Sequence, residues 1–198
     1  MKITKHFEPI EYLVVEDFYT KEELWLINRE IDFLFTKLKP PTVHSSAVDE
    51  RNQVIKQNKA ILLDNTYADR TVSDILTVNR KTFSREIMDA MKSLHPAFRA
   101  VDTCNMDSTL LNYYGANDHY KPHIDASQFT FLTFFVPEDK EYTGGDLMLE
   151  GVEIQQKNNM MIGFIGAYEH EVTPIKLKTE TSLGRISMTQ FLFTRGGA

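Results

Sequence analysis

Cysteine is almost absent from this sequence, since Cys104 is the only one among 198 residues. A single thiol excludes an intramolecular disulfide framework and any zinc site built from several cysteines. We therefore expect Cys104 to be a small buried hydrophobic side chain. Long apolar runs are missing too, because no stretch approaches the roughly 18 residues that a membrane-spanning helix needs. The amino-terminal segment also lacks the apolar core of a signal peptide, so we expect a cytoplasmic protein without a membrane partner.

Positive charge is scarce. The chain has 22 lysines and arginines against 28 acidic residues, which gives a net charge of -6. Domains that bind nucleic acid usually carry a basic surface, so we expect no nucleic-acid partner. A peptide, a protein or a small molecule remains as the expected partner, and nothing indicates the oligomeric state. The content of 42% hydrophobic and 25% charged residues is that of an ordinary globular protein. We expect one domain over residues 1–198.

The first half of the chain has the patterns of helices. Thr20 and Glu23 form a capping box, which predicts a helix over residues 21–38 that ends before Pro40 and Pro41. Helical spacing of apolar residues predicts two more helices, over 69–80 and 83–94. Short apolar runs predict strands at 12–15 and 60–64. Residues 1–100 therefore form a helix-rich support.

The second half has the pattern of strands. Short aromatic and β-branched runs alternate with breaks rich in Gly or Asp, at 108–114, 129–136, 145–151, 160–166 and 184–193. Such spacing is typical of an antiparallel sandwich or barrel. We expect an α+β fold in which residues 105–193 form the β-structure and helices, mainly from the first half, pack outside it.

The segment "HYKPHID" contains two of the six histidines and an aspartate. In extended chain, residues i and i+2 point to the same side, so His123 and Asp125 can face one point together. His119 and His123 would form a metal pair on a helix, but Gly115 and Pro122 make a helix improbable there. We therefore interpret His119 as a loop residue. A chance pair of solvated loop side chains is the alternative for this motif alone.

A third ligand is available in "GAYEHEVTP", where His170 follows an apolar strand. Two imidazoles and one carboxylate are the donor set that suits non-haem Fe(II) and leaves coordination positions open. A zinc hydrolase with the same three ligands is a competing interpretation. In that case the strand "GRISMTQFLF" has no obvious purpose, because Arg185 and Ser187 would share a face and could bind a carboxylate. Arg185 in a surface ion pair is the alternative for that strand.

Together these motifs resemble the 2-oxoglutarate- and Fe(II)-dependent dioxygenases, and within them the prolyl 4-hydroxylase-like subgroup. The resemblance covers residues 105–193. "YYGANDHYKPHID" is similar to the subgroup's entry strand, "TGGDLML" to its Gly-Gly-acid-Leu hairpin, "HEVTP" to its distal-ligand segment and "GRISMTQFLF" to its co-substrate strand. "YLVVEDFYTKEEL" is similar to the segment that often precedes this domain. The implied fold is a double-stranded β-helix, a cupin-like jelly roll.

The resemblance also implies roles for particular residues. The implied iron ligands are His123, Asp125 and His170. Arg185 is the implied anchor for the distal carboxylate of 2-oxoglutarate, and the implied assisting residues are Tyr114, Tyr120, Thr133 and Ser187. Two alternatives stay open: Tyr113 in place of Tyr114, and Lys176 or Lys178 in place of Arg185, because the stretch between His170 and Arg185 is longer than usual.

The implied activity is hydroxylation of a substrate carbon with Fe(II), 2-oxoglutarate and O2, releasing succinate and CO2, with ascorbate as a further candidate cofactor. The expected substrate is a prolyl residue in a peptide or protein. Hydroxylation of a free amino acid or another small molecule is the alternative, and a non-catalytic jelly-roll binding module is a second one. The polar segment 42–59, with Arg51, Lys56 and Lys59, is predicted to be either a substrate lid or a mobile loop.

Overall fold

The computed structural model describes residues 1–41, 48, 51 and 53–195. Within them the strands form two main antiparallel sheets. The large sheet has the order β1 (Lys2–His6), β2 (Tyr12–Glu16), β11 (Met160–Ile165), β7 (Phe129–Phe135), β14 (Arg185–Phe193), β5 (Met106–Tyr114) and β4 (Lys59–Leu62). The small sheet has the order β10 (Val152–Ile154), β9 (Leu147–Leu149), β12 (His170–Val172), β6 (His119–His123) and β3 (Lys56–Gln57). Strands β8 (Tyr142–Thr143) and β13 (Lys176–Leu177) form a separate pair.

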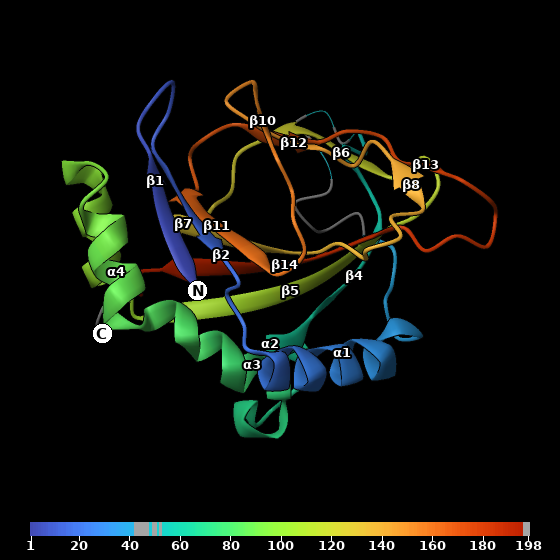
Figure 1. Ribbon diagram of the computed structural model, residues 1–198, viewed down its shortest axis with the longest axis horizontal. Helices are drawn as coiled ribbons and strands as arrows, with labels where there is room; N and C mark the ends of the chain where they lie inside the picture. The colour runs from blue at the N-terminus through green and yellow to red at the C-terminus, as the bar shows by residue number, and fades with distance from the viewer. Residues whose placement is uncertain (42–47, 49–50, 52, 196–198) are drawn as a thin grey trace.

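The large sheet is covered on both faces, and strand alternation decides which side chains meet which cover. On β7, Leu132 and Phe134 belong to an apolar cluster with Leu147 and Leu149 of the small sheet. Phe131 and Phe135, which alternate with them along β7, belong to a second cluster, with the helices. In Figure 1 the helices lie below and to the left of the large sheet, and strands β6, β10 and β12 lie above it. A sheet that is buried on both faces explains why all residues of β7 are buried.

The helices come from the first half of the chain, as expected. They are α1 (Lys21–Phe35), α2 (Leu63–Thr66), α3 (Asp74–Val78) and α4 (Arg85–Lys92), together with 3-10 turns at Arg70–Val72, Asn79–Phe83 and Pro96–Thr103. The capping box of Thr20 and Glu23 is confirmed, with both reciprocal hydrogen bonds formed. None of the helices in this described part of the chain is long and apolar enough to cross a membrane.

Several predicted boundaries are wrong. Helix α1 ends at Phe35 rather than residue 38. The helix predicted over 69–80 is interrupted at Ser73, whose hydroxyl accepts a hydrogen bond from the Leu76 amide and starts α3. Ser favours such caps because its side chain competes with the helical backbone. The strand predicted at 60–64 ends at Leu62, where α2 begins. His119 is a strand residue of β6 rather than a loop residue, because β3 pairs alongside it.

Cys104 is not the fully buried side chain that the sequence predicts. It is half-buried at the end of a 3-10 turn, and its thiol donates to Gln128 Oε1 at 3.2 Å. The polar segment 42–59 is described only in part. Residues 42–47, 49, 50 and 52 lie outside the described residues, so the predicted lid is untested.

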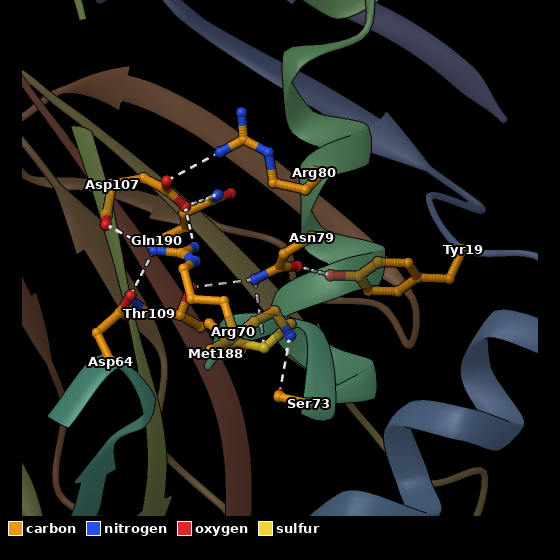
Figure 2. A network of polar contacts seen from close by, with 11 residues as sticks. Tyr19, Asp64, Arg70, Ser73, Asn79, Arg80, Asp107, Thr109, Met188 and Gln190 are labelled. Carbon is orange, nitrogen blue, oxygen red and sulfur yellow. Dashed lines mark hydrogen bonds and ion pairs between the residues drawn. The ribbon is translucent and has the colours of Figure 1, made fainter. Parts of the chain in front are cut away.

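A network of polar groups around the buried Asp107, with partly exposed arginines, joins the helical layer to the large sheet (Figure 2). At its centre is Asp107 of β5, which accepts hydrogen bonds from Arg70 at 2.9 Å, Arg80 at 3.0 Å and Gln190 at 2.8 Å. Asp64 adds a second carboxylate, which pairs with Arg70 and accepts from the Thr109 amide at 2.7 Å. Each carboxylate is satisfied by several donors, which is the condition for burying a charge. The network therefore fixes the short helices against β5 and β14.

We predict that Asp107→Asn lowers the free energy of unfolding by about 2 kcal/mol, because it leaves two arginines without their shared anion. Urea denaturation of the purified protein measures the change. Asp102→Asn is the matched control, since Asp102 pairs with Lys92 at the exposed surface and its removal should leave the midpoint unchanged. Equal effects of the two substitutions would show that the network is not a structural anchor.

Candidate metal centre

The register between β6 and β12 places two histidines face to face. His123 ends β6, His170 begins β12, and the two are directly paired across the antiparallel ladder. Asp125 follows β6 by two residues, and its backbone amide donates to Gly166 O at 2.8 Å. This bond ties the loop after β6 to the end of β11. Segments far apart in sequence therefore converge on one point.

The three side chains form a compact donor set. His170 Nε2 lies 3.4 Å from Asp125 Oδ2, and His123 Nε2 lies 3.9 Å from Asp125 Oδ1. One donor atom from each residue lies within 4.8 Å of the other two. All three side chains are largely buried, with 6–11% of their surface exposed. The spacing is that of ligands around a single ion.

Hydrogen bonds fix which ring nitrogen faces the centre. His123 Nδ1 lies 2.9 Å from Lys121 O, and His170 Nδ1 lies 2.9 Å from Tyr168 O. Each Nδ1–H donates to a carbonyl, so each Nε2 keeps its lone pair and points to the shared centre. Burial, together with the neighbouring His170, lowers the pKa of His123 to about 4. The ring is therefore neutral at pH 7 and available as a ligand.

Asp125 is held in its ionised form. Burial opposes ionisation, but His170 and the Thr130 hydroxyl keep the pKa of the Asp125 carboxyl below its usual value. Thr130 Oγ1 donates to Asp125 Oδ2 at 2.6 Å, and Ser127 Oγ lies 2.9 Å from Thr130 Oγ1. This chain of hydroxyls orients the carboxylate from the β7 side. Sequence analysis missed Thr130, although its alternation with Leu132 along β7 places it on the same face.

Arg185 is the largest fully buried side chain, with 1% of its surface exposed. Its Nε donates to Gln156 Oε1 at 3.0 Å and its Nη1 donates to Ser187 Oγ at 2.9 Å. Its Nη2 is buried and has no partner among the described residues. Burial lowers the pKa of Arg185, but an arginine remains charged in proteins. A buried guanidinium with a free N–H lacks the anion that normally accompanies it.

The glycines of "TGGDLML" permit this burial. Gly145 has a φ of +69°, and a Cβ at this position would lie 3.1 Å from Arg185 Cδ and 2.8 Å from Ile175 Cδ1. The Gly145 carbonyl also accepts from Gln156 Nε2 at 2.9 Å. Only glycine combines the left-handed backbone with this close approach. The hairpin therefore positions both Arg185 and the Gln156 that orients it, a residue that sequence analysis missed.

The structure distinguishes between the alternative residues that the sequence left open beside the candidate metal centre. Tyr114 rather than Tyr113 lies beside Arg185, whose guanidinium is 5.2 Å from the ring centroid. Tyr113 instead packs on Phe35 in the helical layer. Lys176 is exposed on β13, and Lys178 lines a surface groove with it rather than the metal centre. Of Arg185, Lys176 and Lys178, Arg185 is thus the one buried beside the three candidate ligands.

Thr133 does not belong to the site. Its hydroxyl bonds to Tyr19 on the face of β7 that meets the helices. The expectation is wrong by one strand position, because side chains of neighbouring residues point to opposite faces. Tyr120 lies at the site, with its ring stacked on His123 at a centroid separation of 3.4 Å.

Two adjoining cavities lie at the centre. A small inner cavity of about 30 Å³ is lined by the three candidate ligands together with Tyr114, Arg185, Ser187 and Thr189. A larger cavity of about 470 Å³ shares Lys56, Leu110, Tyr120, Asp125 and Phe191 with it. The larger cavity is also lined by the polar residues Lys39, Asn58, Asn65 and Ser108.

Lys56 is buried although lysine is rarely so. It is 8% exposed and its Nζ lies 4.7 Å from the centroid of the Tyr120 ring. Burial lowers the pKa of Lys56 to about 8, against the opposing effect of Asp125. The ammonium therefore remains the major form at pH 7. The sequence indicates Lys56 only as part of the polar segment 42–59, because a two-residue strand has no recognisable periodicity.

Comparison with known proteins shows where this arrangement recurs. The family model of the 2OG-Fe(II) oxygenase superfamily matches residues 109–193, which include all three candidate ligands and Arg185. Residues 109–193 are thus similar to the 2OG-Fe(II) oxygenases. The resemblance seen in the sequence is thus confirmed, and with it an enzyme of the dioxygenase class. No curated protein sequence matches the chain.

Solved structures share the fold of the oxygenase at low sequence identity. A Pseudomonas putida prolyl-4-hydroxylase is 14% identical, with a TM-score of 0.63 over 93% of each chain. A viral collagen prolyl hydroxylase from Paramecium Bursaria Chlorella virus-1, in complex with 2OG, is 16% identical, with a TM-score of 0.57 over 91% of this chain and 94% of that chain. An alpha-ketoglutarate-dependent epimerase from nogalamycin biosynthesis is 12% identical, with a TM-score of 0.56 over 92% of this chain and 77% of that chain. The jelly-roll fold is confirmed, and these relatives catalyse more than one reaction.

We predict that Asp125→Ala lowers the affinity of the oxygenase for Fe(II) at least about 100-fold, because loss of a ligand exceeds the 10–100-fold cost of losing an outer hydrogen bond. Equilibrium dialysis under argon, followed by elemental analysis, measures bound iron. His119→Ala, on the preceding strand β6, is the matched control, since the His119 ring bonds to Asn117 O and lies outside the donor set. Equal iron binding by the two variants would contradict the assignment of Asp125.

Proposed function

We propose that His123, Asp125 and His170 hold Fe(II) in an oxygenase that hydroxylates a carbon atom of a prolyl residue in a peptide. The observation that supports this most is the pairing of a His-Asp-His donor set with a buried cation at one cavity. Three donor atoms within 4.8 Å of one another suit one ion, and one hard oxygen with two imidazoles suits iron in particular. A zinc hydrolase gives no purpose to the buried Arg185.

The residues present also fit 2-oxoglutarate. Arg185 Nη2 is buried without a partner among the described residues, and Ser187 Oγ lies 2.9 Å from Nη1. A carboxylate at this position would receive a charge-assisted hydrogen bond and would neutralise the buried guanidinium. Tyr114, beside Arg185, is a further candidate contact for the co-substrate. Bound iron, with 2-oxoglutarate and O2, supplies the oxidising power for hydroxylation, and succinate and CO2 are released.

The protein's own residues position the reactants and exclude water. Gln156 and Ser187 fix the direction of the Arg185 guanidinium, so that the co-substrate binds in one orientation. Thr130 fixes the Asp125 carboxylate, and the two backbone carbonyls fix the imidazoles. The apolar residues Leu132, Leu147 and Val172 close the inner cavity. A preorganised and dry site is what an oxidation of unactivated carbon needs.

A prolyl substrate is the finer part of the proposal. It is supported by the motif order, which is that of the prolyl 4-hydroxylase-like subgroup, and by two prolyl hydroxylases among the structural relatives. The 470 Å³ cavity beside Asp125 offers space for a substrate ring. Ascorbate belongs to the proposal as an aid that keeps iron reduced. A free amino acid is the second candidate, because Lys56 places a positive charge in the same cavity.

We predict that Arg185→Gln raises the KM for 2-oxoglutarate about 30-fold or more, in line with the 2–5 kcal/mol cost of losing one member of a buried charge pair. Uncoupled formation of succinate from 2-oxoglutarate measures the KM. Lys176→Gln removes the same charge from the exposed strand β13 and should leave the KM unchanged. Thermal melting checks that both variants fold. A large defect in the Lys176 variant alone would assign the anchor to Lys176.

We predict that incubation with Fe(II), 2-oxoglutarate, O2 and ascorbate adds the mass of one oxygen atom to prolyl peptides. Tandem mass spectrometry locates the added oxygen, and succinate is measured in the same sample. Peptides in which alanine replaces proline are the control. If succinate forms but no peptide gains hydroxyproline, the protein is an oxygenase with another substrate. If no substrate stimulates succinate formation, the proposed activity is contradicted.

A further inference from the structure

The 470 Å³ cavity contains a cation that the metal centre and the co-substrate do not use. Lys56 lines both cavities from strand β3 of the small sheet. Its ammonium, the Tyr120 ring and the His123 ring are successive neighbours, with separations of 4.7 Å and 3.4 Å. Arg185, in contrast, lines only the inner cavity. Of these two buried cations, only Lys56 lines the larger cavity.

Asp125 acts on the Lys56 ammonium through space, but no ion pair joins Lys56 to a carboxylate of the described residues. Asp125 is the single acidic side chain among the described residues that line the two cavities. With the proposed Fe(II) and 2-oxoglutarate bound, the metal, Arg185 and Lys56 would carry four positive charges, against one negative charge of Asp125 and two of the co-substrate. One positive charge would then remain in excess, and Lys39 at the rim adds to it. A buried cation without a counter-ion is costly unless a ligand supplies one.

Asn58 provides an independent sign of a missing ligand in the same cavity. The residue is 4% exposed and its Nδ2 donates to Asn112 Oδ1 at 3.0 Å. Asn112 in turn donates to Thr189 Oγ1 at 3.3 Å, which fixes the orientation of the whole row. Asn58 Oδ1 is buried and has no partner among the described residues. A buried acceptor of this kind normally meets a donor, here one brought by a ligand.

We propose that this cavity binds a substrate that carries a carboxylate, with Lys56 as the residue that recognises the charge and Asn58 as the acceptor for a substrate N–H or O–H. The inference rests on the proposed function, because it concerns the substrate of that same site. The carboxylate belongs to a free amino acid, to the carboxyl terminus of a peptide or to an acidic side chain next to the oxidised residue. All three present the same chemistry to an ammonium.

Matched acid and amide ligands test the charge recognition directly. N-acetyl-L-proline and N-acetyl-L-prolinamide form one pair, and the two N-acetyl-leucine compounds form a second. Binding is measured by calorimetry on the Fe(II)-loaded protein, saturated with 2-oxoglutarate and kept under argon. We expect the acid of at least one pair to bind about tenfold tighter than its amide, the size of one charge-assisted hydrogen bond. Equal affinities within both pairs would overturn the proposal.

Variants of Lys56 on β3 and of Lys59 on β4 test whether Lys56 causes the preference for the acid over the amide. Lys56→Met and Lys56→Gln should abolish the acid preference, and Lys56→Arg should retain it. Lys59→Met is the matched control, because Lys59 is an exposed lysine on β4 outside this cavity. Loss of the preference in the Lys59 variant as well would mean a general surface-charge effect and would overturn the proposal. The same holds if the Lys56 variants lose affinity for 2-oxoglutarate and keep the acid preference.

The source of the carboxylate and the proposed activity are separable. Free proline, N-acetylproline and an amidated peptide with glutamate beside proline are compared, and the tightest ligand identifies the source. An acid preference that depends on Lys56 supports the inference even if no peptide is hydroxylated, since the binding experiment needs no turnover. Hydroxyproline formation without any acid preference leaves the proposed function intact and overturns this inference alone.

Discussion

The covering of the large sheet on both faces is the constraint on which the site depends. Helices pack on one face of the large sheet, and the small sheet packs on the other. Alternate side chains of a strand therefore point either into the dry core beneath the helices or toward the cavity. Strand β14 shows this division, because Arg185, Ser187 and Thr189 line the cavity while Met188 and Leu192 belong to the helical core. A shift of one residue would exchange the two sets. The apolar cluster beneath β7 and β14 therefore fixes the register that aims the arginine inward.

Buried polar and charged groups lie on both faces of the large sheet, and the two sets differ in how completely they are paired. Beneath the sheet, Asp107 and Asp64 are saturated by arginines and amides, which suits a permanent structural contact. Above the sheet, Arg185 Nη2 and Asn58 Oδ1 have no partner among the described residues. Unmet groups in a dry environment cost stability, and functional sites are where such costs are tolerated. For charged groups the two faces differ, because the carboxylates beneath the sheet are paired whereas the Arg185 guanidinium above it keeps an unmet N–H; the neutral Gln190 Oε1 beneath the sheet is unmet as well.

The sequence indicated the residues of the candidate metal centre but only part of their surroundings. His123 and Asp125 were predictable because strand alternation is a local rule, and the Arg185 strand because an isolated charge in an apolar strand is conspicuous. Thr133 was misplaced since the resemblance carried no information on strand phase. Lys56 and Gln156 lie on short or irregular segments, and their position depends on tertiary contacts that no local pattern encodes. The broken helix near Ser73 was missed because a single capping serine outweighed the apolar spacing around it.

The separation of the two cations bears on how one pocket can distinguish two anionic molecules. Arg185 lines the inner cavity with a planar guanidinium that Gln156 and Ser187 hold in place. Such a group favours an anion that approaches from one defined direction. Lys56 presents a compact ammonium beside an aromatic ring, which attracts an anion but imposes little direction. Asn58 and Asn112 supply the directional contacts that the ammonium lacks. Under the proposed function, the co-substrate would therefore be selected by the geometry of the charge, whereas the outer cavity would combine a non-directional charge with an oriented row of amides.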